Sequence, residues 1–135
     1  MKTLHPQYLS EWRKKVASKL ERLKRLYMKG CSSELLFHGQ PTAVYRKCGK
    51  EQCKCTEGGG KRHGPYSIIR INREGKRRQI TLKRNEMHFY EMAERYQEQV
   101  RNRRKIIELQ KEVLSMLDEL SGKRTLWDKA AYGKK

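Results

Sequence analysis

A chain of 135 residues has room for one ordinary domain, or for a small module flanked by helices. With 36% hydrophobic and 36% charged residues, it can bury only a small core, and small cores need support from a metal, a cross-link or a partner chain. The formal net charge of +18 makes a polyanion the expected partner, because each neutralised phosphate releases counterions. The alternative is that the excess of Lys and Arg only keeps the protein soluble.

Membrane insertion and secretion are not expected. The sequence contains no apolar run of transmembrane length, and its first residues, MKTLHPQYLSEW, are too polar for a signal peptide. We therefore expect a cytoplasmic protein without a membrane partner. In that reducing compartment its four cysteines would bind metal rather than form disulfides.

The first expected element is an amphipathic helix from about Pro6 to Met28. Proline suits the first helical turn, and Gly30 is expected to end the helix in the left-handed conformation. Apolar residues recur at spacings of three and four, which predicts one buried stripe: Leu9, Trp12, Val16, Leu20, Leu23 and Tyr27. A loop or short helical turn over residues 31–41 completes this N-terminal segment, 1–41.

Residues 48–66 read CGKEQCKCTEGGGKRHGPY and bring three cysteines and a histidine into one short stretch. Three thiolates and an imidazole complete a tetrahedral zinc site, and neighbouring lysines would favour the thiolate form. The predicted zinc ligands are Cys48, Cys53, Cys55 and His63. Cys31 and His38 compete for the fourth position, and the alternatives without metal are reduced thiols or a redox pair of Cys53 and Cys55. With no open ligand position and no adjacent general base, the zinc would be structural.

The same stretch carries a resemblance. The run CGKxxCxC, a Gly-rich stretch, HGPY, a strand, an Arg and a Gly-Lys turn resemble a family of short, uncharacterised prokaryotic proteins often encountered near transposases and recombinases of mobile elements. The resemblance covers about residues 44–83 and leaves the flanking helices outside. It implies that Cys48, Cys53, Cys55 and His63 act together, that Tyr66 and Arg70 belong to the same module, and that the protein is associated with a mobile element.

Three antiparallel strands are expected within a basic zinc-binding module, 42–85, over residues 42–46, 66–72 and 76–82. This module holds 13 basic and 3 acidic residues. A turn at Glu74-Gly75 pairs Ile69 with Ile80 on an apolar face that must cover a helix. The same turn pairs Arg70 with Gln79 on a polar face.

The polar face carries the side chains that can read base edges in the major groove. This favours binding to duplex DNA. The alternative is single-stranded RNA stacked on Tyr45 and Tyr66. The expected nucleic-acid contacts are Lys47, Lys50, Lys54, Lys61, Arg62, Tyr66, Arg70, Asn72, Arg77, Gln79, Thr81, Lys83, Arg84, Lys123 and Arg124.

A long helix is predicted from an N-cap at Asn85 to about Leu120, ended by Ser121-Gly122. Residues 86–121 hold 6 basic and 8 acidic residues, so this arm, 86–122, is not expected to bind phosphate. Its distal apolar residues alternate at spacings of three and four, as in a coiled coil. They predict a homodimer, or docking on a larger protein, through Ile106, Leu109, Val113, Met116 and Leu120. The alternative is that the turns of this helix beyond the reach of the first helix fold back on the sheet or fray. Residues 123–135 would be a basic, flexible tail.

The expected fold class is α+β: a small zinc-bound, three-stranded antiparallel sheet flanked by two long helices, which we expect to be antiparallel. Without a P-loop, a Ser/His/Asp arrangement or paired metal-binding carboxylates, the sequence does not indicate an enzyme. Two functions remain: a DNA-binding accessory protein or regulator of a mobile element, and an RNA-binding subunit that docks on a larger partner through its helices.

Overall fold

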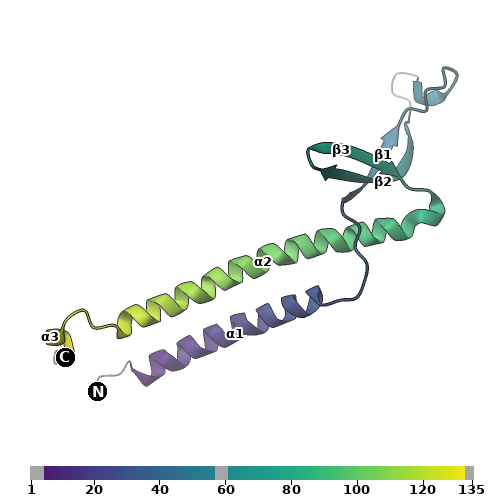
Figure 1. Ribbon diagram of the computed structural model, residues 1–135. Coiled ribbons are helices and arrows are strands. Elements are labelled where there is room, and N and C mark those ends of the chain that lie inside the picture. The colour runs from purple at the N-terminus through teal and green to yellow at the C-terminus, as the bar shows by residue number, and fades with distance from the viewer. Residues whose placement is uncertain (1–4, 57–60, 133–135) are drawn as a thin grey trace. The chain divides into compact units, whose positions relative to one another are not determined.

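The computed structural model describes residues 5–56 and 61–132 (Figure 1). The chain divides into two compact units. One unit, here called the sheet unit, is Ser33–Arg101, and the other, the helical unit, combines Met1–Ser32 with Asn102–Lys135. The fold class is α+β, as predicted: a three-stranded antiparallel sheet, a long N-terminal helix and a second long helix.

The first helix, α1, spans Pro6–Gly30. The His5 side chain accepts a hydrogen bond from the backbone N–H of Gln7, which satisfies one of the free donors of the first turn. The expected glycine stop is wrong: Gly30 is still helical, and Cys31 caps the helix with φ −89°. Its backbone N–H donates to the carbonyl of Met28, so a tightened last turn replaces the left-handed cap.

The second long helix, α2, spans Met87–Arg124, and a short helix, α3, spans Lys129–Tyr132. The predicted N-cap at Asn85 is wrong, because a 3-10 turn over Arg84–Glu86 precedes α2. There the Glu86 carboxylate accepts a hydrogen bond from the Lys83 backbone N–H at 3.1 Å. A residue of the turn itself thus satisfies a backbone donor that precedes the helix. At the other end α2 continues through Gly122, and α3 adds a helical turn to the predicted flexible tail.

Within the helical unit, α1 and the second half of α2 are antiparallel (Figure 1). Lys19 forms an ion pair with Glu112 at 2.5 Å. Two further hydrogen bonds join the helices, from the Gln110 amide to the Tyr27 hydroxyl and from Lys123 to the Tyr8 hydroxyl. The predicted stripes are only partly covered: Leu23 and Leu109 are buried, whereas Ile106, Val113, Met116 and Leu120 are half-buried.

The sheet is ordered β1-β2-β3, with β1 over Gln40–Arg46, β2 over His63–Arg73 and β3 over Lys76–Thr81. The predicted register is confirmed, since Ile69 pairs with Ile80 and Arg70 with Gln79. The turn between β2 and β3 places Glu74 at φ 54° and Gly75 at φ 75°. Two consecutive positive φ angles are typical of the two-residue turn whose twist matches that of the strands.

One face of the sheet covers the start of α2, as predicted. Ile69, Leu82 and Ala93 form the buried cluster of this core, and the residues packed against it are Phe37, Ile71, Ile80, Phe89 and Tyr90. The burial of Ile68 was not expected. This residue is 0% exposed although it lies on the polar face, opposite the face that carries the core. The polar face therefore has an apolar centre between Thr42 and Thr81 on the flanking strands. No helix of the described residues is both long and apolar enough to cross a membrane.

Candidate metal centre and exposed sheet face

The four predicted zinc ligands lie together in the sheet unit. The sulfur atoms of Cys48, Cys53 and Cys55 and a ring nitrogen of His63 are all within 4.8 Å of one another. Cys48 Sγ lies 3.4 Å from Cys55 Sγ, and Cys53 Sγ lies 3.0 Å from His63 Nε2. Over the described part of the chain this is the one group of three or more such residues that could hold a metal ion.

The sheet itself positions His63. After a bulge between Val44 and Arg46, β1 pairs Arg46 with His63, so β2 begins earlier than the sequence predicts. The loop that starts at the end of β1 therefore returns to the same strand pair. Within that loop, a 3-10 turn over Lys54–Thr56 buries Cys55, which is 1% exposed. The pairing of β1 with β2 thus positions His63, and the 3-10 turn positions Cys55.

Gly64 makes this return possible because a larger residue would not fit. Its φ is +135°, and a Cβ atom at this position would lie 2.7 Å from the Val44 carbonyl oxygen and 3.1 Å from the Tyr66 backbone nitrogen. A contact under 3.0 Å with backbone requires the strands to shift. The glycine that follows His63 therefore lets β1 and β2 approach each other beside the ligand.

The local hydrogen bonds favour a thiolate at the centre of the cluster. The backbone N–H of Cys48 donates to Cys55 Sγ at 3.4 Å, and this bond is the main reason that the pKa of Cys55 falls to about 7. A backbone hydrogen bond from Lys50 lowers the pKa of Cys48, but the Cys55 and Cys53 thiols and burial together raise it above its usual value. The cluster therefore has one thiol, that of Cys55, which ionises near neutral pH. The ionised thiolate is the form that binds metal.

The donor set fits a metal ion. Zinc–sulfur and zinc–nitrogen bonds of about 2.3 and 2.0 Å place tetrahedral ligand atoms about 3.5–3.8 Å apart. The two shortest separations are 3.4 and 3.0 Å, and none exceeds 4.8 Å, so shifts of about 1 Å or less would bring the four atoms to these distances. The competing ligands lie elsewhere: His38 is hydrogen-bonded to the Tyr96 hydroxyl at 2.8 Å, and Cys31 caps α1 in the other unit.

The polar face of the sheet lies in the same unit. All six residues predicted there are exposed, on β2, on β3 or directly after β3: Arg70, Asn72, Arg77, Gln79, Thr81 and Lys83. The register places Arg70 beside Gln79 and Asn72 beside Arg77. Sequence reasoning missed Arg46, whose guanidinium donates to Gln79 Oε1 at 3.4 Å from the end of β1. Regular alternation along β1 places Arg46 on the same face as Thr42, which pairs with Ile68, so the alternation of residues was a signal that could have found it.

The other predicted nucleic-acid contacts are distributed over both units. In the sheet unit, five exposed basic residues lie on the metal loop, Lys47, Lys50, Lys54, Lys61 and Arg62, while Tyr66 and Arg84 are exposed near the strand ends. Lys123 and Arg124 end α2 in the helical unit. Lys123 Nζ lies 4.5 Å from the centroid of the Tyr8 ring and 3.7 Å from Glu119 Oε1. The hydrogen bond to Tyr8 is the main cause of the raised pKa of Lys123. Lys123 therefore already has partners within its own unit.

A protein-family model matches much of the chain. A family model described as "Domain of unknown function (DUF6788)" matches residues 7–90. The match extends well beyond residues 44–83, since it takes in nearly all of α1, the whole sheet and the first turn of α2. The expectation that both flanking helices lie outside the resemblance is therefore wrong for α1. No curated protein and no solved structure matches the chain. Because the matched segment is more than half of the sequence, the chain belongs to the family of domains of unknown function DUF6788.

Proposed function

We propose that this protein is a nucleic-acid-binding accessory protein or regulator that contacts duplex DNA through the polar face of its sheet. One observation carries the proposal: Arg70 pairs with Gln79 across the strands, Asn72 pairs with Arg77, and all four side chains are exposed. Arg can make two hydrogen bonds to guanine, and Asn or Gln can make two to adenine. A two-stranded ribbon carrying such side chains fits the major groove.

The charge around this face supports a polyanionic partner. A groove of about 760 Å³ at the end of the sheet is lined by three arginines, Arg70, Arg77 and Arg78, and by no acidic residue. Within the described part of the chain, neither Arg70 nor Arg77 forms an ion pair. No carboxylate of the described residues thus neutralises these two guanidinium groups, and phosphate oxygens would be strong acceptors for them.

The metal in this proposal is a structural zinc ion. Cys48, Cys53, Cys55 and His63 would fill all four positions, so zinc would tie the basic loop to the strand pair and would not activate a water molecule. The loop carries five of the exposed basic residues. Fixing it beside the sheet would give the phosphate contacts a defined position relative to the base-reading side chains.

The biological setting that we propose follows from the resemblance noted in the sequence. Short proteins with the CGKxxCxC and HGPY segments are often encountered near transposases and recombinases, so we place this protein among the accessory factors of a mobile element. A basic module that recognises a DNA site suits such a factor. The nearly neutral arm of α2 would then serve assembly, with a second copy or another protein.

The test is a comparison of DNA affinities for variants on the two faces of the sheet. A preferred duplex is first selected from a random pool. Arg70→Ala and Gln79→Ala should then weaken binding to that duplex by about 1–3 kcal/mol each, and affect random duplex less. Arg73→Ala is the matched control, because Arg73 is exposed on the same strand but on the opposite face. Equal losses for Arg70→Ala and Arg73→Ala, measured by fluorescence anisotropy at fixed salt, would reject base reading by this face.

RNA remains the second candidate because two tyrosines near the metal loop are accessible. Tyr45 is 57% and Tyr66 39% exposed, each close to the loop end of its strand. Unpaired bases stack on such rings, at about 1–3 kcal/mol per base. Duplex DNA, structured RNA and single-stranded RNA are therefore competed in the same assay. A preference for single-stranded RNA that Tyr66→Ala abolishes, with no effect of Gln79→Ala, would replace DNA by RNA as the partner.

A further inference from the structure

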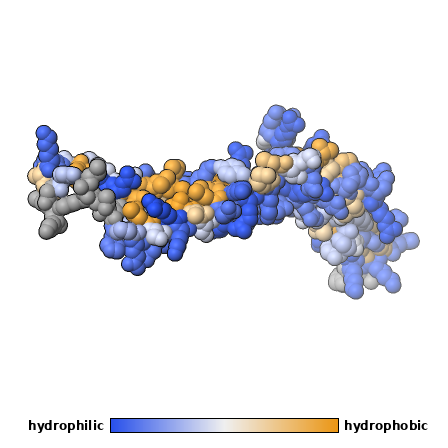
Figure 2. Space-filling model, turned by 90° about the horizontal axis from the view of Figure 1, so that it is seen from below, coloured by the Kyte–Doolittle hydropathy of each residue, from blue (hydrophilic) through white to orange (hydrophobic). Residues whose placement is uncertain are grey.

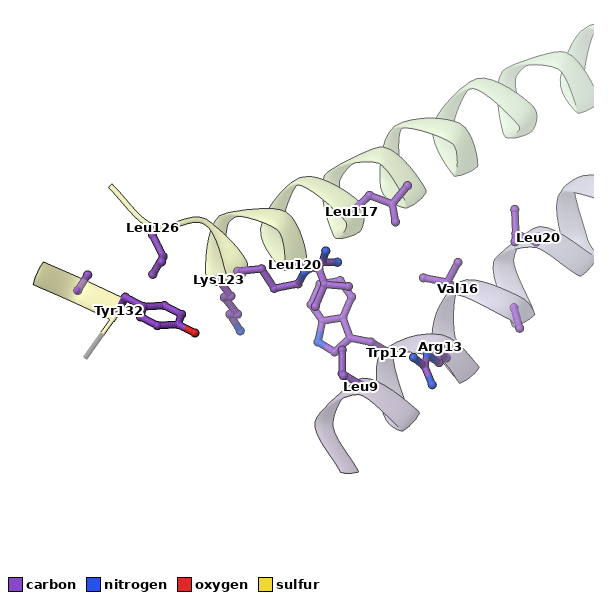
Figure 3. Close-up of a pocket in the computed structure, with 13 residues that line it drawn as sticks. Leu9, Trp12, Arg13, Val16, Leu20, Leu117, Leu120, Lys123, Leu126 and Tyr132 are labelled. Carbon is purple, nitrogen blue, oxygen red and sulfur yellow. The ribbon is translucent and has the colours of Figure 1, made fainter. Parts of the chain in front are cut away.

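The helical unit contains an apolar groove that the proposed DNA-binding face does not use. It has a volume of about 960 Å³ and lies between α1 and the end of α2, with Leu126 and Tyr132 at one end (Figure 3). Its large apolar side chains come from the two helices: Leu9, Trp12, Val16, Leu20, Leu117 and Leu120. The groove lies wholly within one unit.

Much of this apolar surface is open to solvent. Leu20 is 50% exposed and Leu117 is 45% exposed, and Figure 2 shows hydrophobic side chains gathered over α1 and the second half of α2. Two helices side by side bury only one stripe on each, so they leave the flanks of both stripes uncovered. Four helices around a common axis enclose those flanks. An apolar patch bordered by charged residues is typical of a binding surface.

The charges at the groove restrict what can cover it. The charged residues that line it are Arg13, Lys123 and Arg124, and no acidic residue lines it. Carboxylates on an occupant would be attracted to this border, whereas lysines and arginines would be repelled. The fitting occupant is therefore a helix with an apolar stripe flanked by acidic residues.

The chain itself carries such a helix. On α2, Ile107 and Leu114 are 44% and 59% exposed and lie seven residues apart, on one face with Leu117. Exposed Glu108 and Asp118 flank this stripe. Residues 106–120 hold one basic and four acidic side chains, whereas α1 holds eight basic and two acidic ones. Glu112 and Glu119 already pair with Lys19 and Lys123 of the same chain, so Glu108 and Asp118 are the carboxylates that face a partner. The acidic helix of one copy thus complements the basic border of the groove in another.

We propose that two copies of this chain associate through their helical units, so that the stripe of Ile107, Leu114 and Leu117 of each copy is seated in the groove of the other. The product is a two-fold symmetric, antiparallel four-helix bundle. The proposed stripe differs from the one predicted from the sequence. Of that predicted set, Leu109 is already buried in the single chain and the others are half-buried, so the adjacent face of α2 forms the interface.

Sedimentation equilibrium of the nucleic-acid-free, full-length protein tests this proposal. The wild type should form a dimer across a dilution series, and added salt should weaken it because the groove border and the stripe are oppositely charged. Leu114→Glu should raise the dimer dissociation constant by about tenfold or more, because it places a charge in the bundle core. Leu114 is 59% exposed in the single chain, so this variant should keep its fold, which circular dichroism verifies.

Met28→Glu is the matched control, because Met28 is also exposed and apolar but does not line the groove; its dissociation constant should equal that of the wild type. A second readout does not depend on variants. When heavy- and light-isotope chains are mixed, carbodiimide should join Lys123 of one chain to Glu108 or Asp118 of the other. A monomer at every concentration, or a dimer that Leu114→Glu leaves unchanged, would overturn the proposal.

Discussion

The two units of this chain gain their order in different ways. The sheet unit closes a small core of Ile69, Leu82 and Ala93 on one side of its sheet, and a cluster of potential metal ligands ties its loop to the strands. Among the described residues of the helical unit, the buried apolar side chains are Leu23 and Leu109, and polar contacts such as the one between Lys19 and Glu112 also join its helices. It keeps an apolar groove open. One unit can thus be completed by a metal ion, and the other by a second chain.

The balance of basic and acidic residues also differs between the two units. Residues 41–85 hold 13 basic and 3 acidic side chains, whereas residues 106–120 hold one basic and four acidic side chains. A strong positive field attracts nucleic acid over distances of several ångströms, while a mixed helix surface favours a specific helix partner. If the sheet unit binds nucleic acid and the helical unit mediates assembly, as we propose, a short chain divides these tasks between two units, and each can be disturbed by itself.

Removal of a metal ligand should have the largest effect and should act on one unit only. Cys55→Ser should abolish binding of about one zinc ion per chain and the cooperative unfolding of the sheet unit, because structural zinc can contribute about 10–16 kcal/mol. Hydrogen exchange measured by mass spectrometry should show faster exchange in β2, with α1 unchanged. Cys31→Ser is the control, since Cys31 lies outside the cluster. Elemental analysis that finds no zinc in reduced wild-type protein would contradict the zinc assignment.

Truncation of buried core side chains should have an intermediate effect on stability. Each truncation should destabilise its own unit and leave the other unit protected. Ile69→Ala removes a fully buried side chain from the sheet core, and we expect a loss of about 2–5 kcal/mol in the free energy of unfolding. Leu109→Ala, a buried position of the helical unit, should accelerate exchange in α1 and leave β2 protected. The two variants serve as controls for each other. Equal acceleration of exchange in both units by either variant would mean that the units unfold together.

The smallest effect on stability should come from lowering the pH, which acts on an ion pair of the helical unit. Lys19, through its hydrogen bond and then its charge, holds the pKa of Glu112 below the usual 4.5. A lowered pKa means that this carboxylate stabilises the folded state above pH 4.5, and that the contribution is lost as the pH falls through the lower, folded value. Because both side chains are substantially exposed, the change in thermal midpoint should be small. Glu112→Gln should remove this part of the acid sensitivity; an identical pH profile in the variant would show that the pair contributes nothing.

Several local features were predictable because they depend on neighbours in sequence. The turn at Glu74-Gly75 needs two positive φ angles, and this fixes the pairing of Ile69 with Ile80 and of Arg70 with Gln79. The spacing of Cys48, Cys53 and Cys55 with His63 predicted the ligand cluster. The helix ends were predicted less well, because Gly30 and Asn85 are common cap residues whose use depends on competing backbone and side-chain hydrogen bonds.

The sequence alone determined the fold class, the strand register and the identity of the clustered ligands, since these follow from periodicity, turn chemistry and donor type. Only the tertiary structure decided which surfaces stay open. The burial of Ile68 on the polar face and the hydrogen bond from Arg46 to Gln79 depend on residues that are far apart in sequence. The groove between α1 and α2 likewise exists because two helices cannot cover both flanks of their apolar stripes, and no periodicity states which flank remains exposed.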